Sequence, residues 1–516
     1  MNCQRTSTFN HTRLATLALS CATIALLGTT ATAGDTQISK RPETLVYPPL
    51  LFSPPTASQY RTTLSDGTTL FMLPSHEFPL INLSISCMGG RNLDTANLAG
   101  LASMTAGMMR LGGTTTMSAN DVDERLDFMA TNMGVRSQDW TTTASIDCLA
   151  SNFDASLAIL IDTLKNPGFD DAKFKIARAD ALEGLKQRND DASSISGREW
   201  NYLVYGGDHF ESRQPTGPSI EAITVAEMRT MAARIFHPGN MIISVTGDFD
   251  PKTLPATLDK ALAGWTKGPA NAAPVGPTHK IQPGVYYVQK AIPQGKVIIG
   301  LESMQRDNPD FYAFTMMNEI LGGGGFSSRI MGRVRSDEGL AYSAGSNFRA
   351  GIFYPGIFRA GYESKSPTVA LALKLIMEEF NKMRDQPVTA AELDIAKASA
   401  VETFPSTFAS KSAMLGVFVS DEWTKRPAGF WENYRAKITA VTAADIQRVA
   451  QKYLVPSKMA ILVVGNWADI SKGDLAARAN MSLFGPATEL PMRDPITLEP
   501  ISANTSSAAP PAASGG

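Results

Sequence analysis

The sequence predicts an α+β protein with two homologous halves, each a mostly antiparallel sheet covered by helices. Three observations predict this fold class. The chain has 516 residues, more than one hydrophobic core usually organises. A segment that begins at Thr224 recurs, without a gap, from Thr442. Finally, strand-like stretches are grouped between helices instead of alternating with them, which is typical of helices layered on a sheet.

The internal repeat consists of a helix, a turn that contains proline, and an apolar strand closed by glycine. One copy runs from Thr224 to Gly247 and the other from Thr442 to Gly465. Apolar residues in each copy follow the helical i, i+3, i+4, i+7 spacing before the strand begins. A second, shorter sequence match pairs Ile176 with Ile395 at nearly the same sequence offset. A repeat of this length indicates a duplicated domain and not a solenoid.

The local patterns of the first half alternate between strands and helices in an irregular order. Asp66-Gly67 predicts a hairpin turn between two short strands. The remaining elements are predicted from periodicity. They are a hairpin over 61–74, a strand over 80–88, helices over 98–111 and 119–132, two strands within 135–147, and helices over 153–165 and 170–188.

Both ends of the chain differ in composition from its middle. Arg5 and Arg13, the apolar run from Leu14 to Gly28, and a small-residue site ending at Ala33 predict a cleaved signal peptide and an exported, periplasmic or secreted protein. The tail is rich in Ser, Ala, Pro and Gly and is expected to be disordered. The expected organisation is signal peptide 1–33, Pro-rich leader 34–60, first domain 61–266, linker 267–283, second domain 284–486 and tail 487–516.

Charge and cysteine usage exclude several classes of partner and site. The formal net charge is −2 and no Lys/Arg-rich run occurs, which argues against a nucleic-acid partner. No segment reaches the ~18 apolar residues of a membrane span. Cys21 lies in a poor lipoprotein context. Cys87 and Cys148 remain after cleavage, either as a disulfide or as two buried thiols, and the sequence leaves both readings open.

Two motifs resemble the pitrilysin/insulinase family of HxxEH (inverzincin) zinc peptidases. A strand that ends at Cys87 and a glycine-containing turn lead to Ala99-Gly-Leu-Ala102, where the family places AGLA before HxxEH. In the second half, Leu321-GGGGFSSR is followed by Arg335-SDEGLAYS, similar to the glycine run, FSSRL and VRxxxGLAYS of the family. The resemblance covers roughly residues 61–485 and implies two α+β halves.

The resemblance also implies a zinc site that this chain has lost. In the family, His at i and i+4 of one helix bind zinc, Glu at i+3 is the general base, and a Glu from a later helix is the third ligand. The corresponding positions here hold residues that cannot form this site, since only the serine carries even a weak donor. They are Ser103, Ala106, Gly107 and Gly184.

No other metal site is indicated, so no cofactor is expected in this chain. The predicted mature chain keeps four histidines, and no two of them are spaced as neighbours on a helix face. We interpret each as a surface or capping residue. They are His76, His209, His237 and His279.

The second motif is nearly intact and supplies the candidate functional residues. By resemblance, Arg335 and Tyr342 bind the substrate backbone and support the tetrahedral intermediate. An Arg and a phenol both donate hydrogen bonds to a peptide carbonyl or an oxyanion. A helix over 327–338 and a C-cap at Gly339 would place them. The expected substrate loop is Gly322, Gly323, Gly324, Gly325 and Phe326.

Together, these features lead to one preferred functional hypothesis and two alternatives. The preferred one is a non-catalytic, substrate-binding subunit of a periplasmic heterodimer, whose HxxEH-containing partner holds zinc and cleaves peptides or unfolded segments. One alternative is a proteolytically inactive binding or assembly scaffold from the same family. The other is a peptidase with a different apparatus, which Ser103 supports weakly because no His or Lys lies near it in sequence.

Overall fold

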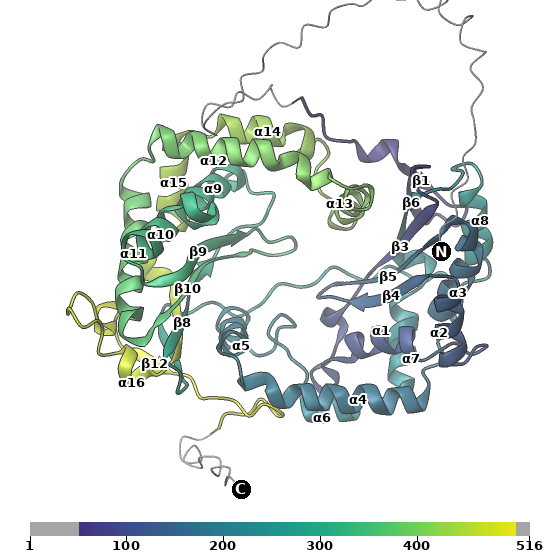
Figure 1. Ribbon diagram of the computed structural model, residues 1–516, viewed down its shortest axis with the longest axis horizontal. Coiled ribbons are helices and arrows are strands. Elements are labelled where there is room, and N and C mark those ends of the chain that lie inside the picture. Colours follow the sequence, from purple (N-terminus) through teal and green to yellow (C-terminus); the bar gives the residue numbers. More distant parts are fainter. Residues whose placement is uncertain (1–50, 502–516) are drawn as a thin grey trace, which may run out of the picture. The chain divides into compact units, whose positions relative to one another are not determined.

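Two six-stranded sheets, each covered by helices, form the folded part of the protein. The computed structural model describes residues 51–501, and all of these except Leu51 belong to one compact unit that starts at Phe52. The predicted α+β class is confirmed (Figure 1). The predicted signal peptide lies outside the described residues. Between residues 51 and 501, no helix is both long enough and apolar enough to cross a membrane.

The two sheets have the same internal order. The first is β1-β2-β6-β3-β5-β4 and the second is β12-β7-β11-β8-β10-β9. In both, one central pair is parallel, β2 with β6 and β7 with β11, while the next three pairs are antiparallel. The strands are β1 (Arg61–Thr63), β2 (Thr69–Pro74), β3 (Leu80–Met88), β4 (Asn132–Ser137), β5 (Thr141–Leu149), β6 (Met241–Gly247), β7 (Gly284–Gln289), β8 (Gln294–Glu302), β9 (Ala341–Arg349), β10 (Ile357–Lys365), β11 (Ala460–Gly465) and β12 (Ala487–Glu489).

The helices also follow in corresponding order along the two halves. Those of the first half are α1 (Leu101–Leu111), α2 (Ala119–Phe128), α3 (Phe153–Lys165), α4 (Asp171–Lys186), α5 (Ala192–Tyr205), α6 (Gly217–Ala222), α7 (Val225–Ile235) and α8 (Leu254–Leu262). Those of the second half are α9 (Phe311–Asn318), α10 (Arg329–Met331), α11 (Val369–Asp385), α12 (Ala390–Thr403), α13 (Lys411–Thr424), α14 (Phe430–Ala440), α15 (Ala443–Tyr453) and α16 (Trp467–Ile470).

The repeated segment folds identically in the two halves because its local signals are the same. Thr224 caps α7 and Thr442 caps α15, each in a reciprocal capping box with the acidic residue three positions on. Each helix then leads through a proline-containing turn into a strand, and this strand pairs in parallel with an early strand of the same half, β6 with β2 and β11 with β7. The predicted duplication is therefore visible in the fold.

One helix of each half packs on the sheet of the other half. Helix α5 contacts β8 and β11, and Trp200 lies in a buried cluster with Val288 and Leu462. Helix α13 contacts β2 and β6, where Phe418 lies 6.0 Å from the Phe71 ring. Through these contacts, helices from the opposite stretch of chain cover hydrophobic faces of both sheets.

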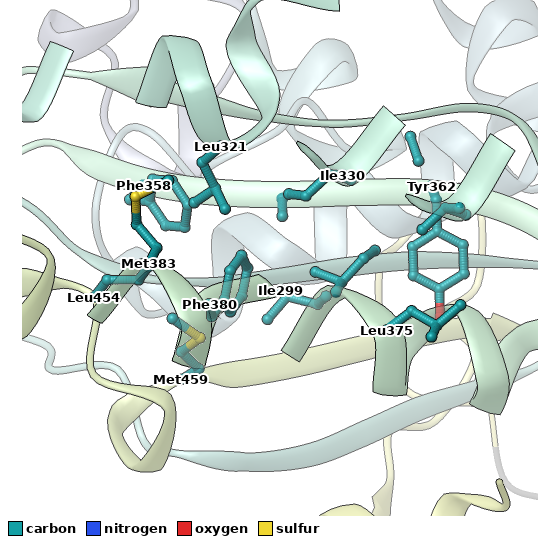
Figure 2. Close-up of a cluster of buried hydrophobic side chains, with 14 of the residues drawn as sticks. Ile299, Leu321, Ile330, Phe358, Tyr362, Leu375, Phe380, Met383, Leu454 and Met459 are labelled. Carbon is teal, nitrogen blue, oxygen red and sulfur yellow. The ribbon is translucent and has the colours of Figure 1, made fainter. Parts of the chain in front are cut away.

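The core of the second half lies between its sheet and the helices of that half. Figure 2 shows side chains from β8 and β10 packed against those of α11 and of the turn after α15. Leu321, at the start of the glycine run, and Ile330 of α10 point into the same cluster. The core thereby anchors both ends of the loop that carries the glycines. The labelled residues are Ile299, Leu321, Ile330, Phe358, Tyr362, Leu375, Phe380, Met383, Leu454 and Met459.

The ends of the described region are more structured than predicted. The expectation of disorder from residue 487 is wrong for 487–501, because β12 pairs with β7 and the Ile496 carbonyl accepts a hydrogen bond from Gly217 at 2.8 Å. In the leader, Phe52 packs against Phe404, with ring centroids 5.8 Å apart. Apolar residues among the prolines and small residues find partners in the core, and composition does not reveal them.

The predicted local elements agree with the structure to within a few residues. The hairpin of residues 61–74 and the strand of 80–88 are found as predicted, but the helix predicted over 98–111 begins at Leu101 and that over 119–132 ends at Phe128. Cys87 and Cys148 are free, buried thiols. Cys148 lies opposite Ile81 on β3, six residues from Cys87, so the two sulfurs are too far apart to bond.

Candidate functional site

The helix that should carry HxxEH keeps its place in the fold. Helix α1 packs against β4 and α7, and its N-terminus is held by the buried Asp94 carboxylate, which accepts hydrogen bonds from the backbone N–H groups of Gly100 and Ala102 at 2.9 Å each. Burial raises the pKa of Asp94 to about 6, against the opposing effect of these two donors. The N-terminus of α1 is thus fixed by a buried side chain.

The ligand positions on this scaffold carry no donor set for zinc. Ser103 and Gly107 lie on the exposed face of α1, whereas Ala106 is buried. A Cβ atom added at Gly107, or at Gly184 of α4, would meet no neighbour within 4 Å. In residues 51–501, Ser103 has no hydrogen-bond partner that could activate its hydroxyl. These residues do not fit a zinc ion, and no catalytic step can be derived through one here.

The histidines are occupied elsewhere in the fold. His76 pairs with Asp248, His209 bonds to the Val275 carbonyl, and His279 to that of Leu203. His237 is buried, and its Nδ1 accepts the Gly268 N–H at 3.2 Å. Within the described residues, no three His, Cys, Asp or Glu side chains are grouped to hold a metal ion.

The glycine run passes close to the edge strand of the second sheet. A Cβ atom at Gly322 would lie 2.4 Å from the backbone N of Ser346 on β9, so only glycine permits this approach. Gly325 adopts a positive φ of 60°, which turns the chain towards Phe326. Phe326 is 73% exposed. The loop is therefore packed at its start and presents an aromatic ring to solvent at its end.

Arg335 lies between two exposed aromatic rings. Its guanidinium carbon is 4.8 Å from the centroid of Phe326 and 4.7 Å from that of Tyr342, which is 84% exposed. Cation–π contacts of this kind orient a guanidinium without using its N–H groups. The Arg335 side chain makes no hydrogen bond or ion pair inside the described part of the chain. Its donors are thus oriented but free to bind a carbonyl or carboxylate oxygen.

A short irregular helix places Arg335 and Tyr342 next to each other. The predicted helix over 327–338 consists of α10 and a π-helical turn at Gly332–Asp337, and it ends at Gly339. Gly339 has a positive φ of 62° and its N–H donates to the Arg335 carbonyl, as a C-cap residue does. The chain then reverses into β9, where Tyr342 is the second residue. Such π-turns recur at functional sites.

A cavity of about 990 Å³ adjoins Tyr342. It lies on the exposed face of β8, β10 and β9, and α5 forms its opposite side with Ser193 and Gly197. The sequence did not point to this cavity, because α5 comes from the first half of the chain. The charged residues of β10 that line it, such as Arg359 and Lys365, alternate with buried residues, and this period-two pattern is the signal that could have revealed the exposed face.

Comparison with known proteins relates part of the chain to a known domain. Residues 222–400, which include the glycine run, Arg335 and Tyr342, match the profile described as "Peptidase M16 inactive domain". This part of the chain is similar to that domain. This result confirms the resemblance inferred from the sequence.

Relatives of this chain include proteins described as a non-peptidase homolog and as zinc proteases. It is 23% identical to the non-peptidase homolog YmxG of Helicobacter pylori, over 76% of this chain and 90% of that one. It is also 23% identical to an uncharacterized zinc protease of Mycobacterium leprae, over 79% of this chain and 92% of that one. The crystal structure of a peptidase M16 inactive domain from Pseudomonas fluorescens superposes on this chain with a TM-score of 0.70 at 22% identity. The superposition covers 78% of this chain and 97% of that one.

Proposed function

We propose that this M16 homologue is the non-catalytic, substrate-binding subunit of an exported zinc-metallopeptidase heterodimer. In this complex, an HxxEH-containing partner holds the zinc, and Arg335 and Tyr342 of this chain bind the peptide next to it. The complex cleaves peptides or unfolded segments in the periplasm, as the signal-like N-terminus suggests. The observation that carries the proposal is the Arg335 guanidinium, which contacts Phe326 and Tyr342 while no described residue uses its donors.

The chemistry of this pair suits a peptide in the act of cleavage. The guanidinium offers several N–H donors and the phenol one O–H donor, and both can bind a carbonyl oxygen as it gains negative charge. The degenerate face of α1 supplies neither a metal nor a base, so the nucleophile has to come from a partner. A pure scaffold has no need for an arginine oriented in this way, and this favours the subunit hypothesis over the scaffold.

The test compares the purified mature chain, alone and with an HxxEH-bearing M16 protein of the same organism. Zinc content and cleavage of a quenched fluorescent peptide are measured in each case. We expect neither zinc nor cleavage from the chain alone, and cleavage on mixing. Arg335→Ala should lower the activity of the mixture about 100- to 1,000-fold, the range seen when one oxyanion donor is removed, and Tyr342→Phe by less.

Arg333→Ala is the matched control, because Arg333 lies in the same turn but pairs with Asp337 instead of facing the rings. It should leave the activity of the mixture unchanged. Stoichiometric zinc in the lone chain, or cleavage by it that a chelator stops, would overturn the proposal. A complex that forms but is insensitive to Arg335→Ala and Tyr342→Phe would instead indicate the scaffold.

A further inference from the structure

The cavity next to Tyr342 has an unbalanced set of charges. Five charged residues line it, and both of the carboxylates are neutralised. Glu338 pairs with Arg478 at 2.8 Å, and Glu363 pairs with Lys296 at 3.6 Å. Arg359 and Lys365 make no side-chain hydrogen bond or ion pair with any described residue. Two uncompensated positive charges therefore face the same cavity.

These two cations lie on one line along the cavity floor. Arg359 and Lys365 are both exposed residues of β10, six positions apart, and side chains at even spacing project from the same face of a strand. A rise of about 3.3 Å per residue separates them by roughly 20 Å. Between them, Gly361 lies opposite Gly345 of β9 and leaves the part of the floor next to Arg359 without side chains. Glu363, next to Lys365 on the same face, is paired with Lys296.

The other side of the cavity is equally open. Gly197 of α5 lines it, and a Cβ atom at this position would meet nothing within 4 Å. Trp200, one turn further along α5, packs directly over Gly300 of β8 and fixes the helix above the sheet, since a Cβ at Gly300 would lie 2.9 Å from the indole ring. The space between α5 and β10 is thus held open by packing beside it.

We propose that this cavity selects acidic peptide segments: an extended segment lies along β10 beneath α5, with carboxylates near Arg359 and Lys365 and its backbone continuing to Tyr342. This inference rests on the proposed function and names the substrate class of the same site. Guanidinium and ammonium groups recognise carboxylates by charge-assisted hydrogen bonds. The glycine floor admits backbone, and the spacing of the cations matches two acidic residues six positions apart in an extended chain.

The test measures the affinity of the mature chain for three matched peptides by isothermal titration calorimetry at low ionic strength. Each is a blocked serine–alanine–leucine peptide with two glutamates, two glutamines or two lysines six residues apart. We expect the glutamate peptide to bind about fivefold more tightly than the glutamine peptide, as two partly exposed ion pairs permit, and the lysine peptide to bind most weakly. The preference should shrink as salt is added.

Three variants locate the preference in the cavity. Arg359→Gln combined with Lys365→Gln should equalise the glutamate and glutamine peptides, while Gly197→Leu should weaken all three by filling the space. Lys437→Gln, on the exposed face of α14, is the matched control and should change nothing. Equal affinities for the glutamate and glutamine peptides in the unmodified chain, or a preference that survives the double substitution, would overturn this inference alone. Failure to bind any of the peptides would instead count against the proposed substrate-binding function.

Discussion

Arg329 donates two hydrogen bonds to the Glu392 carboxylate, from Nε at 2.6 Å and from Nη2 at 2.9 Å. Arg329 is the last residue of the glycine-rich motif, and Glu392 belongs to the capping box of α12. The pair therefore fastens the chain just before Arg335 to a helix of the second half. Because Arg329 stabilises the ionised form, the pKa of Glu392 falls to about 2.

This pair predicts a pH-dependent loss of stability. The lowered pKa contributes stability above the ordinary glutamate pKa of about 4.3, and this contribution is lost as the pH falls towards 2. Arg329→Met should reduce the free energy of unfolding by about 1–3 kcal/mol at pH 7, and the difference from the unmodified chain should shrink between pH 4.5 and 2. Urea unfolding of both proteins at several pH values in this range measures the difference in the free energy of unfolding. Lys186→Met, at the exposed Lys186–Glu183 pair, should give no measurable change.

Phe326 should act on activity through Arg335. Removing one of the two rings, in Phe326→Ala, frees the guanidinium to adopt other orientations, and a partly exposed cation–π contact contributes about 0.5–1 kcal/mol. We expect the activity of the two-subunit mixture to fall about two- to fivefold, less than for Arg335→Ala. Phe128→Ala, at an exposed phenylalanine on α2, is the control. An effect as large as that of Arg335→Ala would mean that Phe326 binds the peptide itself.

The reciprocal packing of α5 and α13 predicts that the two halves unfold together. Trp200 and Phe418 are both almost fully buried against the sheet of the opposite half. Trp200→Ala or Phe418→Ala should each lower the free energy of unfolding by about 3–5 kcal/mol. Calorimetry should show one transition, shifted as a whole by either substitution. Two separate transitions, with only one of them shifted, would contradict this coupling.

The lost zinc ligands predict an unusual gain in stability. Gly107 and Gly184 lie in helix interiors with open space where a side chain would be, so Gly107→Ala and Gly184→Ala should each stabilise the protein by about 0.5–1 kcal/mol. Gly322→Ala should destabilise it instead, because the added carbon would collide with the backbone at Ser346. Urea unfolding of the three variants checks both signs. Destabilisation by the alanine at 107 would show that this face is occupied in the folded protein.

Much of the local structure and the motif geometry could be predicted, because both depend on neighbours in the chain. The capping boxes at Thr224 and Thr442 identify the repeated helices, and Gly339 ends the helix before Tyr342 as expected. The π-helical turn that brings Arg335 over the Tyr342 ring was not predicted. Its widened hydrogen bonding depends on how Val334 packs in the core, which no local pattern encodes.

The sequence by itself determined the duplicated α+β fold, the absence of zinc ligands at Ser103, Gly107 and Gly184, and the presence of the Arg335 motif. These features depend on residue identity and short-range periodicity. Only the tertiary structure decided that α5 and α13 each cover the sheet of the opposite half. It also decided that β12 anchors residues 487–501, and that Arg359 and Lys365 share a cavity with Tyr342. The physical reason is that these contacts join residues far apart in the chain, where apolar burial selects the partner without regard to sequence distance.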